Sequence, residues 1–392
     1  MAYEPLLRKS PSELAFKVQP GRYDRYFQNG WSSASLLQRP LVGLQFLRGK
    51  FQENFVFVTT CLAWYLSSSL TNNSGKQILI DFRYPVTLTY FQFAFVGVFC
   101  YLYARLTGRT RIQPLNGALL ALILPVCVFT IFAHLLSSVA IAHVPVSVVH
   151  TIKALSPLFT VAAYRLLFQV RYSTQVYTSL VPLTCGVMLA CSFELSSSLL
   201  GLFSALLSTL VCVAQNIFSK KYVFNDNVPA HIKKSLDKTN YLFYCSWMAF
   251  ALMFPVWYYA EGHDIMFLGV FHSSDNATPT SHAPRLTRAA GFMVVNGLTH
   301  FAQCVLSVTV LSLTSAVSFS ISSLLKRVFV IVMAILWFQQ PVGAVQAAGI
   351  VLTFVGLYLY DRAKMDVNKK ETKVNCYDDY ILPTTAYKAK TK

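Results

Sequence analysis

Two adjacent cations, Lys326 and Arg327, lie inside an otherwise apolar stretch, SISSLLKRVFVIVMAILWF at 320–338. Such a stretch is long enough to cross a bilayer, which takes about 20 residues. A charge near the middle of a membrane costs roughly 2.5–3.5 kcal/mol on insertion scales, so an adjacent pair indicates a function. From Phe82 to Phe193, and from Ala289 to Tyr360, the sequence contains no Asp or Glu. We therefore expect the counter-charge to be an anion that binds and leaves.

A third cation, Lys153, lies about midway along a second apolar stretch, VPVSVVHTIKALSPLFTV at 144–161. His150 precedes it by one turn, and Pro157 follows it by one turn. An arginine offers a planar fork of donors and a lysine offers a point charge, and both suit the oxygens of a phosphate group. The sequence therefore predicts a phosphate site formed by Lys153, Lys326 and Arg327.

Simpler explanations for these residues remain open. A lysine near a helix end can extend to the lipid headgroups, although the long apolar flanks of Lys153 and Lys326 make this awkward. His134 and His150 lie in apolar sequence, where a buried core histidine is at least as common as a ligand contact. The serines around Ser322 can simply allow close helix packing.

The composition is that of a membrane protein. The chain has 392 residues, of which 55% are hydrophobic and 12% charged, against about 25% charged in soluble domains. The net charge is +17, and its basic residues concentrate in the ends of the chain and in alternate loops, as the positive-inside rule predicts. Nucleic acid is not an expected partner. The nine cysteines show no metal-binding spacing, so no metal or cofactor is expected.

The apolar segments predict an all-α membrane protein with ten transmembrane helices. Residues 1–50 are expected to form a basic N-terminal tail, 51–362 the transporter domain and 363–392 a C-terminal tail, with both tails in the cytosol. The acids Glu194, Asp226, Asp237, Glu261, Asp264 and Asp275 fall in predicted loops. The predicted spans are 54–71, 84–106, 116–141, 145–168, 174–193, 197–218, 240–260, 290–312, 316–338 and 342–361.

An internal repeat appears at an offset of 170 residues. Leu155, Phe159, Leu166, Phe168, Gln169, Val181 and Gly186 coincide with Leu325, Phe329, Leu336, Phe338, Gln339, Val351 and Gly356. This pattern predicts two halves, about 54–193 and 197–361, with five helices each. Because five is odd, the halves would be inserted in opposite orientations. Inverted repeats with a site near the midplane of the membrane are a transporter architecture.

Two kinds of signal bear on location. Glycosylation sequons at Asn72 and Asn276 fall on the side opposite to the predicted cytosolic loops. Lys388 and Lys390 form a terminal Lys-x-Lys-x-x pattern, which fits retrieval to the endoplasmic reticulum by coat proteins. We therefore expect a multi-pass protein of the endoplasmic reticulum or Golgi membrane.

Three segments carry a family resemblance: SSLLKRVFVIV, VSVVHTIKALSP and QNIFSKK at 215–221. They resemble the triose-phosphate/phosphate translocators of the drug/metabolite transporter superfamily, which are related to nucleotide-sugar transporters. The likeness covers about 54–362 and is nearest to fungal secretory-pathway members. It implies that Lys153, Lys326 and Arg327 bind the substrate phosphate. It also implies that His134, with Ser137 in place of the family's threonine, contacts the organic moiety.

The chain departs from the plastid members at two places. Gln303 stands where they have a substrate-binding tyrosine, and Ser156 stands where they commonly have a glutamate before the proline. The phosphate part of the site is thus retained, while the contacts to the carbon skeleton are altered. We count Gln303 and His150, with His134 and Ser137, as candidates for contacting the organic moiety.

These observations predict an antiporter that exchanges a small phosphorylated metabolite for inorganic phosphate. A nucleotide-sugar/nucleoside-monophosphate exchanger is the alternative among carriers. A non-transporting factor of secretory membranes is a third hypothesis, which the unpaired cations within the spans disfavour. An enzyme is not expected, since no acid/base pair or metal cluster lies within the spans.

Overall fold

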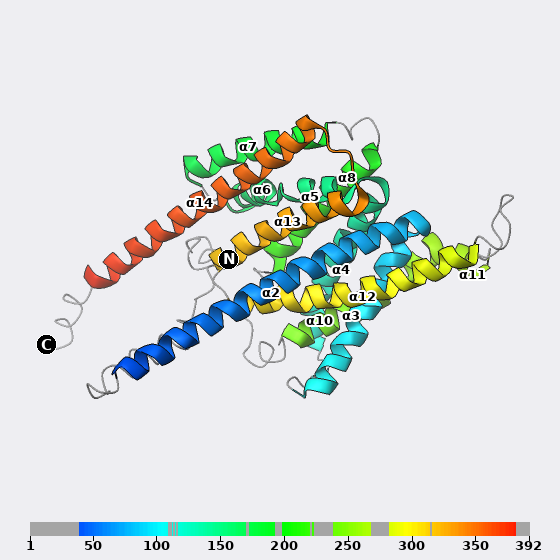
Figure 1. Cartoon of the computed structure of the whole chain (residues 1–392), viewed down its shortest axis with the longest axis horizontal. Coiled ribbons are helices and arrows are strands. Elements are labelled where there is room, and N and C mark those ends of the chain that lie inside the picture. The colour runs from blue at the N-terminus through cyan, green and yellow to red at the C-terminus, as the bar shows by residue number, and fades with distance from the viewer. Residues whose placement is uncertain are drawn as a thin grey trace, which may run out of the picture.

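The computed structural model describes residues 39–108, 112, 114, 117–169, 172–192, 198–219, 222, 238–267, 282–313 and 316–381, and this part contains helices and no strand. The helices are α2 (Arg39–Asp81), α3 (Pro85–Thr107), α4 (Gly117–His143), α5 (Val146–Lys153), α6 (Ser156–Phe168), α7 (Thr174–Cys191), α8 (Leu199–Phe218), α10 (Lys238–Trp257), the π-helix η3 (Tyr258–Gly262), α11 (His263–Phe267), α12 (His282–Leu313), α13 (Ala316–Phe338) and α14 (Ala344–Ile381) (Figure 1).

Within the described residues, nine helical segments are long and apolar enough to cross a membrane. The predicted all-α membrane fold is confirmed. The first predicted span, 54–71, lies within α2 and is not among the nine. With 43 residues, α2 is about 65 Å long, roughly twice the hydrocarbon thickness of a bilayer. The count of ten spans therefore stays a prediction.

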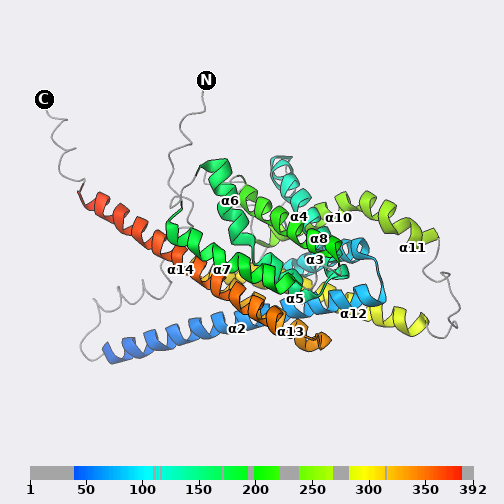
Figure 2. The ribbon, with the colours of Figure 1, turned by 90° about the horizontal axis from the view of Figure 1, so that it is seen from above.

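Both outer helices are longer than the sequence predicts. Helix α2 begins at Arg39, inside the predicted tail, and continues to Asp81, whereas α14 continues to Ile381 beyond the predicted end at 361. The start of α2 and the end of α14 extend from the same end of the bundle in two perpendicular views (Figures 1 and 2). An even number of crossings requires this arrangement.

The predicted span 145–168 is not one continuous helix. It breaks at Ala154 and Leu155 into α5 and α6. Pro157 lies in the first turn of α6. Proline has no N–H for the carbonyl four residues earlier, and it disfavours helical backbone in the residue before it. The break therefore follows from Pro157, and it leaves the carbonyl of Lys153 without its helical donor.

Several structural features recur at the 170-residue offset. The segment 146–168, which α5 and α6 form, corresponds to 316–338 of α13. Both segments are followed by a glutamine in the left-handed region, Gln169 with φ 54° and Gln339 with φ 47°. Helix α4 corresponds to α12 at this offset, and each packs against the first helix of the other predicted half, α4 against α8 and α12 against α2.

Helices α7 and α14, which lie side by side over an extensive contact, also show the 170-residue relation (Figure 2). A side chain at Gly186 would collide with the backbone of Thr353, and one at Gly356 would collide with the backbone of Leu183. Adding 170 to 183 and 186 gives 353 and 356. The contact of Gly186 with Thr353 is therefore equivalent to the contact of Gly356 with Leu183, with the two helices interchanged. A two-fold relation between the halves 54–193 and 197–361 requires such pairs of equivalent contacts. We keep the division into halves as a prediction.

A buried amide joins three of the helices. Asn296 of α12 is fully buried, and its Nδ2 donates to the Thr71 carbonyl at 2.7 Å and to Ser74 Oγ at 3.0 Å, both on α2. Its Oδ1 accepts a hydrogen bond of 2.8 Å from Gln92 Nε2 on α3. Buried polar groups are costly unless they are paired. The network therefore fixes α2, α3 and α12 relative to one another.

Glu261 lies in η3 and is buried, so its prediction as a loop residue is wrong. Its carboxylate accepts hydrogen bonds from Val86 N at 3.0 Å, Thr87 N at 2.6 Å and Thr87 Oγ1 at 2.7 Å. These amides are in the first turn of α3, where backbone N–H groups lack helical acceptors and the helix dipole favours negative charge. Glu261 is thus a cap for α3.

Replacing Asn296 with Ala should destabilise the protein by about 1–3 kcal/mol, because the buried Gln92 Nε2 loses its acceptor and the Thr71 carbonyl loses one of its donors. The melting temperature in detergent measures the loss. Val295→Ala is a matched control, since Val295 is adjacent and 45% exposed. Equal melting temperatures for the two variants would contradict the role of the network.

Candidate functional site

The cations predicted from separate stretches meet in the structure. Arg327 of α13 donates from Nη1 to the Lys153 carbonyl at 2.5 Å and from Nη2 to Ser156 Oγ at 3.2 Å. Ser156 Oγ also donates to the Lys153 carbonyl. This carbonyl is the one that Pro157 deprives of its helical donor. The helix break therefore forms the acceptor that Arg327 uses.

The two lysines have other neutral partners. Lys153 Nζ donates to Ser137 Oγ on α4 at 2.6 Å. Lys326 Nζ lies 4.4 Å from the ring centroid of Trp64 on α2, in a cation–π contact. A hydroxyl and an aromatic ring thus hold the two ammonium groups without neutralising their charge.

The three positive charges act on one another. Lys326 is close enough to Arg327 and Lys153 for their positive charges to repel it, and His150 is within electrostatic range of all three cations. In the part of the chain that the structure describes, none of the three forms an ion pair. The acid whose charge acts on Arg327 is Asp361 of α14, one residue beyond the acid-free stretch identified in the sequence.

Three of the four residues predicted to contact the organic moiety, His134, Ser137 and His150, lie near the cations. His134, one turn from Ser137 on α4, is within range of the charge of Lys153. Its ring is perpendicular to the ring of His300 on α12, with centroids 5.4 Å apart. His300 was not predicted from the sequence. Its only signal there is a histidine in apolar surroundings, one turn before Gln303.

Four polar atoms in this region are buried and have no hydrogen-bond partner among the described residues. They are Trp64 Nε1, His150 Nε2, His300 Nδ1 and Gln303 Oε1. Because nearly all buried polar groups in folded proteins are paired, each unpaired one needs an explanation. Trp64 and His150 lie beside the cations and His300 lies beside His134, so a polar ligand bound to the cations would lie close to these groups.

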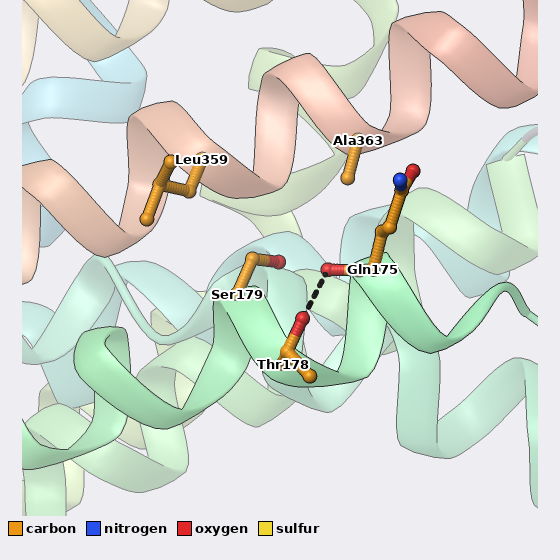
Figure 3. Close-up of a pocket in the computed structure, with 5 residues that line it drawn as sticks. All are labelled: Gln175, Thr178, Ser179, Leu359 and Ala363. Carbon is orange, nitrogen blue, oxygen red and sulfur yellow. Dashed lines mark hydrogen bonds between the residues drawn. The ribbon is translucent and has the colours of Figure 1, made fainter.

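A separate hollow lies between α7 and α14 (Figure 3). Gln175, Thr178 and Ser179 line it from α7, and Leu359 and Ala363 line it from α14. None of the candidate site residues contributes to this hollow, and we do not assign the substrate to it. Among the described residues, no group of three or more His, Cys, Asp or Glu side chains could hold a metal ion.

The remaining predicted sites are outside the cluster. Asn72 lies on α2, and its Nδ2 donates to the Ser68 carbonyl at 2.7 Å, so it is helical rather than in a loop. Glycosylation at Asn72 stays a prediction. Asn276, Lys388 and Lys390 fall outside the described residues.

Comparison with known proteins identifies the family. The model of the Triose-phosphate Transporter family matches residues 55–361. The chain belongs to this family. It is therefore a multi-pass membrane transporter, and the resemblance drawn from the cation motifs is confirmed.

The relatives are transporters by name. A Schizosaccharomyces pombe protein whose name calls it a transporter, C83.11, is 46% identical over 85% of this chain and 72% of its own length. The transporter SLY41 of Saccharomyces cerevisiae is 27% identical over 79% of this chain and 80% of its own. The chloroplast phosphoenolpyruvate/phosphate translocator 1 of Oryza sativa is 31% identical over 79% and 72%.

The two adjacent cations should differ in their effect on stability. Lys326→Met should keep or raise the melting temperature, because it removes a partly buried charge that has no ion pair or hydrogen bond among the described residues. Arg327→Met should lower the stability by about 1–3 kcal/mol, because the Lys153 carbonyl and Ser156 lose a charged donor. Thermal unfolding of both purified variants tests this, and a shift of the same sign in both would contradict it.

Proposed function

We propose that this transporter is an antiporter that exchanges a small phosphorylated organic metabolite for inorganic phosphate. The observation that carries the proposal is the meeting of Lys153, Lys326 and Arg327, whose partners are a hydroxyl, an aromatic ring and a carbonyl. A phosphate dianion supplies what these partners do not, namely negative charge. Plastid relatives named as phosphate translocators support this choice of anion.

Fixed cations also favour obligatory exchange. Moving a site with three positive charges through a low-dielectric core is costly, and a bound anion lowers that cost. Each direction of the cycle would then need an anion, which makes the carrier an antiporter. The correspondences at the 170-residue offset support alternating access between two inverted halves.

The carbon skeleton would bind beside the phosphate, among His134, Ser137, His150 and Gln303. His300 joins this set, because its Nδ1 and Gln303 Oε1 are both buried, one turn apart on α12 and without partners. Their hydroxyl, amide and imidazole groups offer hydrogen-bond donors and acceptors. They suit the hydroxyl and carbonyl oxygens of a small metabolite better than they suit an apolar one.

Location is a proposal from the sequence alone. The terminal Lys388 and Lys390 pattern, with both tails in the cytosol, favours residence in the endoplasmic reticulum or Golgi membrane and contact with coat proteins. The alternative cargo, a nucleotide sugar exchanged for a nucleoside monophosphate, would use the same cations but also needs a pocket for a base.

Exchange should depend on each of the three cations. In proteoliposomes loaded with phosphate, the wild-type protein should take up labelled phosphate, and the Ala variants of Lys153, Lys326 and Arg327 should each lose at least about ten-fold in rate, the loss expected from removing one charged hydrogen bond. Arg327→Lys should also be impaired, since an ammonium cannot reproduce the guanidinium fork.

Arg165→Ala is the matched control. Arg165 is an exposed cation on α6 that bonds to Tyr177, so its removal should leave uptake intact. Phosphorylated metabolites and nucleotide sugars inside the vesicles distinguish the two cargoes. Uptake driven by nucleotide sugars and not by phosphate would refute the proposal.

The helix break should be needed as well. Pro157→Ala returns an N–H donor to the Lys153 carbonyl, which then competes with Arg327 for this acceptor. We expect slower phosphate exchange with an unchanged or higher melting temperature. Pro255→Ala, at an exposed proline inside α10, is the control. Full exchange by Pro157→Ala would show that the freed carbonyl is not required.

A further inference from the structure

Trp64 of α2 contacts two residues of α13. Its side chain is 1% exposed. Its ring stacks on Phe319 with centroids 5.6 Å apart and an angle of 22° between the planes. A second partner of the ring is Lys326, whose Nζ lies 4.4 Å from the ring centroid. The indole is thus held in one place by α13 while it contacts a cation of the same helix.

Lys326 differs from the other two cations of the site. Arg327 and Lys153 donate hydrogen bonds to oxygen atoms. Lys326 forms no hydrogen bond and no ion pair in the described part of the chain, and the charges of Arg327 and Lys153 repel it. The face of the Trp64 ring, which carries partial negative charge, is its attractive contact.

We propose that Trp64 is a positioning residue for the binding of the transported anion. Its indole face holds the ammonium group of Lys326 while the site is empty, and when the anion binds, its phosphate group replaces the indole as the partner of that ammonium group. This inference rests on the proposed exchange of phosphate compounds. An ionised oxygen is a stronger partner for an ammonium group than a ring face is, so the exchange of partners is favourable. Phe319 stacks on the ring and Lys326 lies over it, so both contacts of the indole come from α13.

Because of the position of Trp64, the change of partner at Lys326 affects the packing of two helices. Trp64 belongs to α2, whereas Lys326 belongs to α13, and these helices pack against each other. When the ammonium leaves the ring, one attractive contact between the two helices is lost. Binding of the anion is thereby coupled to the α2–α13 contact, which a plain core tryptophan would not do.

Tryptophan fluorescence of the purified full chain, titrated with inorganic phosphate, tests the inference. The chain has five tryptophans, so variants assign the signal. We expect a phosphate-dependent change of emission in the wild type that is absent in Trp64→Phe. Trp337→Phe should keep the change, since Trp337 is on α13 but 44% exposed. The same change in Trp64→Phe as in the wild type would overturn the inference.

The affinity for phosphate gives a second, independent measurement. Trp64→Leu should bind phosphate about two- to five-fold more tightly by calorimetry, the factor that corresponds to a cation–π contact of ordinary strength. Trp64→Phe should fall between Trp64→Leu and the wild type. Unchanged or weaker binding in both variants would overturn the inference, because it would assign the indole a structural role or a direct bond to the anion.

A third comparison does not need a folded Trp64 variant. Without phosphate, Lys326→Met should differ from the wild type in tryptophan emission, because a cation no longer lies over the ring. Identical spectra would contradict the contact on which the inference rests. A wild type whose melting temperature does not respond to phosphate would overturn the proposed function itself, whereas phosphate binding without a Trp64 signal would overturn only this inference.

Discussion

The hydrogen bond from Arg327 to the Lys153 carbonyl is the interaction on which the arrangement of the site depends. It exists because Pro157 lacks the N–H that would otherwise occupy this carbonyl. The same proline separates α5 from α6 and places Lys153 at the last position of α5. The missing N–H of Pro157 thus interrupts the helix and leaves the Lys153 carbonyl free to accept the hydrogen bond that links α13 to α5.

Neutral partners allow the site to stay positive. A carbonyl, a hydroxyl and an indole face satisfy the directional needs of Arg327, Lys153 and Lys326, while their charge remains available. Charged groups elsewhere in the bundle serve the fold instead. Lys76 donates to carbonyls at and just beyond the end of α4, those of Ile141, Ala142 and Val144, and Glu261 accepts from the start of α3. Both complement a helix dipole, as Arg327 also does at the C-terminal end of α5.

The sequence was sufficient for the membrane class, for most helix positions and for the meeting of Lys153 with Lys326 and Arg327, because hydropathy and the repeat are local or periodic signals. It did not predict that Trp64, His300 and Asp361 lie near the site, since this depends on which helices pack together. The break at 154–155 was missed although Pro157 is visible, because a proline within a membrane span often leaves the helix continuous. The ends of α2 and α14 were missed because hydropathy stops at the membrane while the helix continues.

The offset of 170 residues explains why the site lies where the two halves would meet. Position 157 corresponds to position 327, so the proline that frees the carbonyl and the arginine that occupies it stand at equivalent places. Arg327 bonds to Ser156, whose equivalent is Lys326, the neighbour of Arg327 itself. Two segments related by a two-fold axis touch through equivalent positions only near that axis. With the halves related in this way, the proposed phosphate site would contact both halves whichever side of the membrane is open, as alternating access requires of a substrate site.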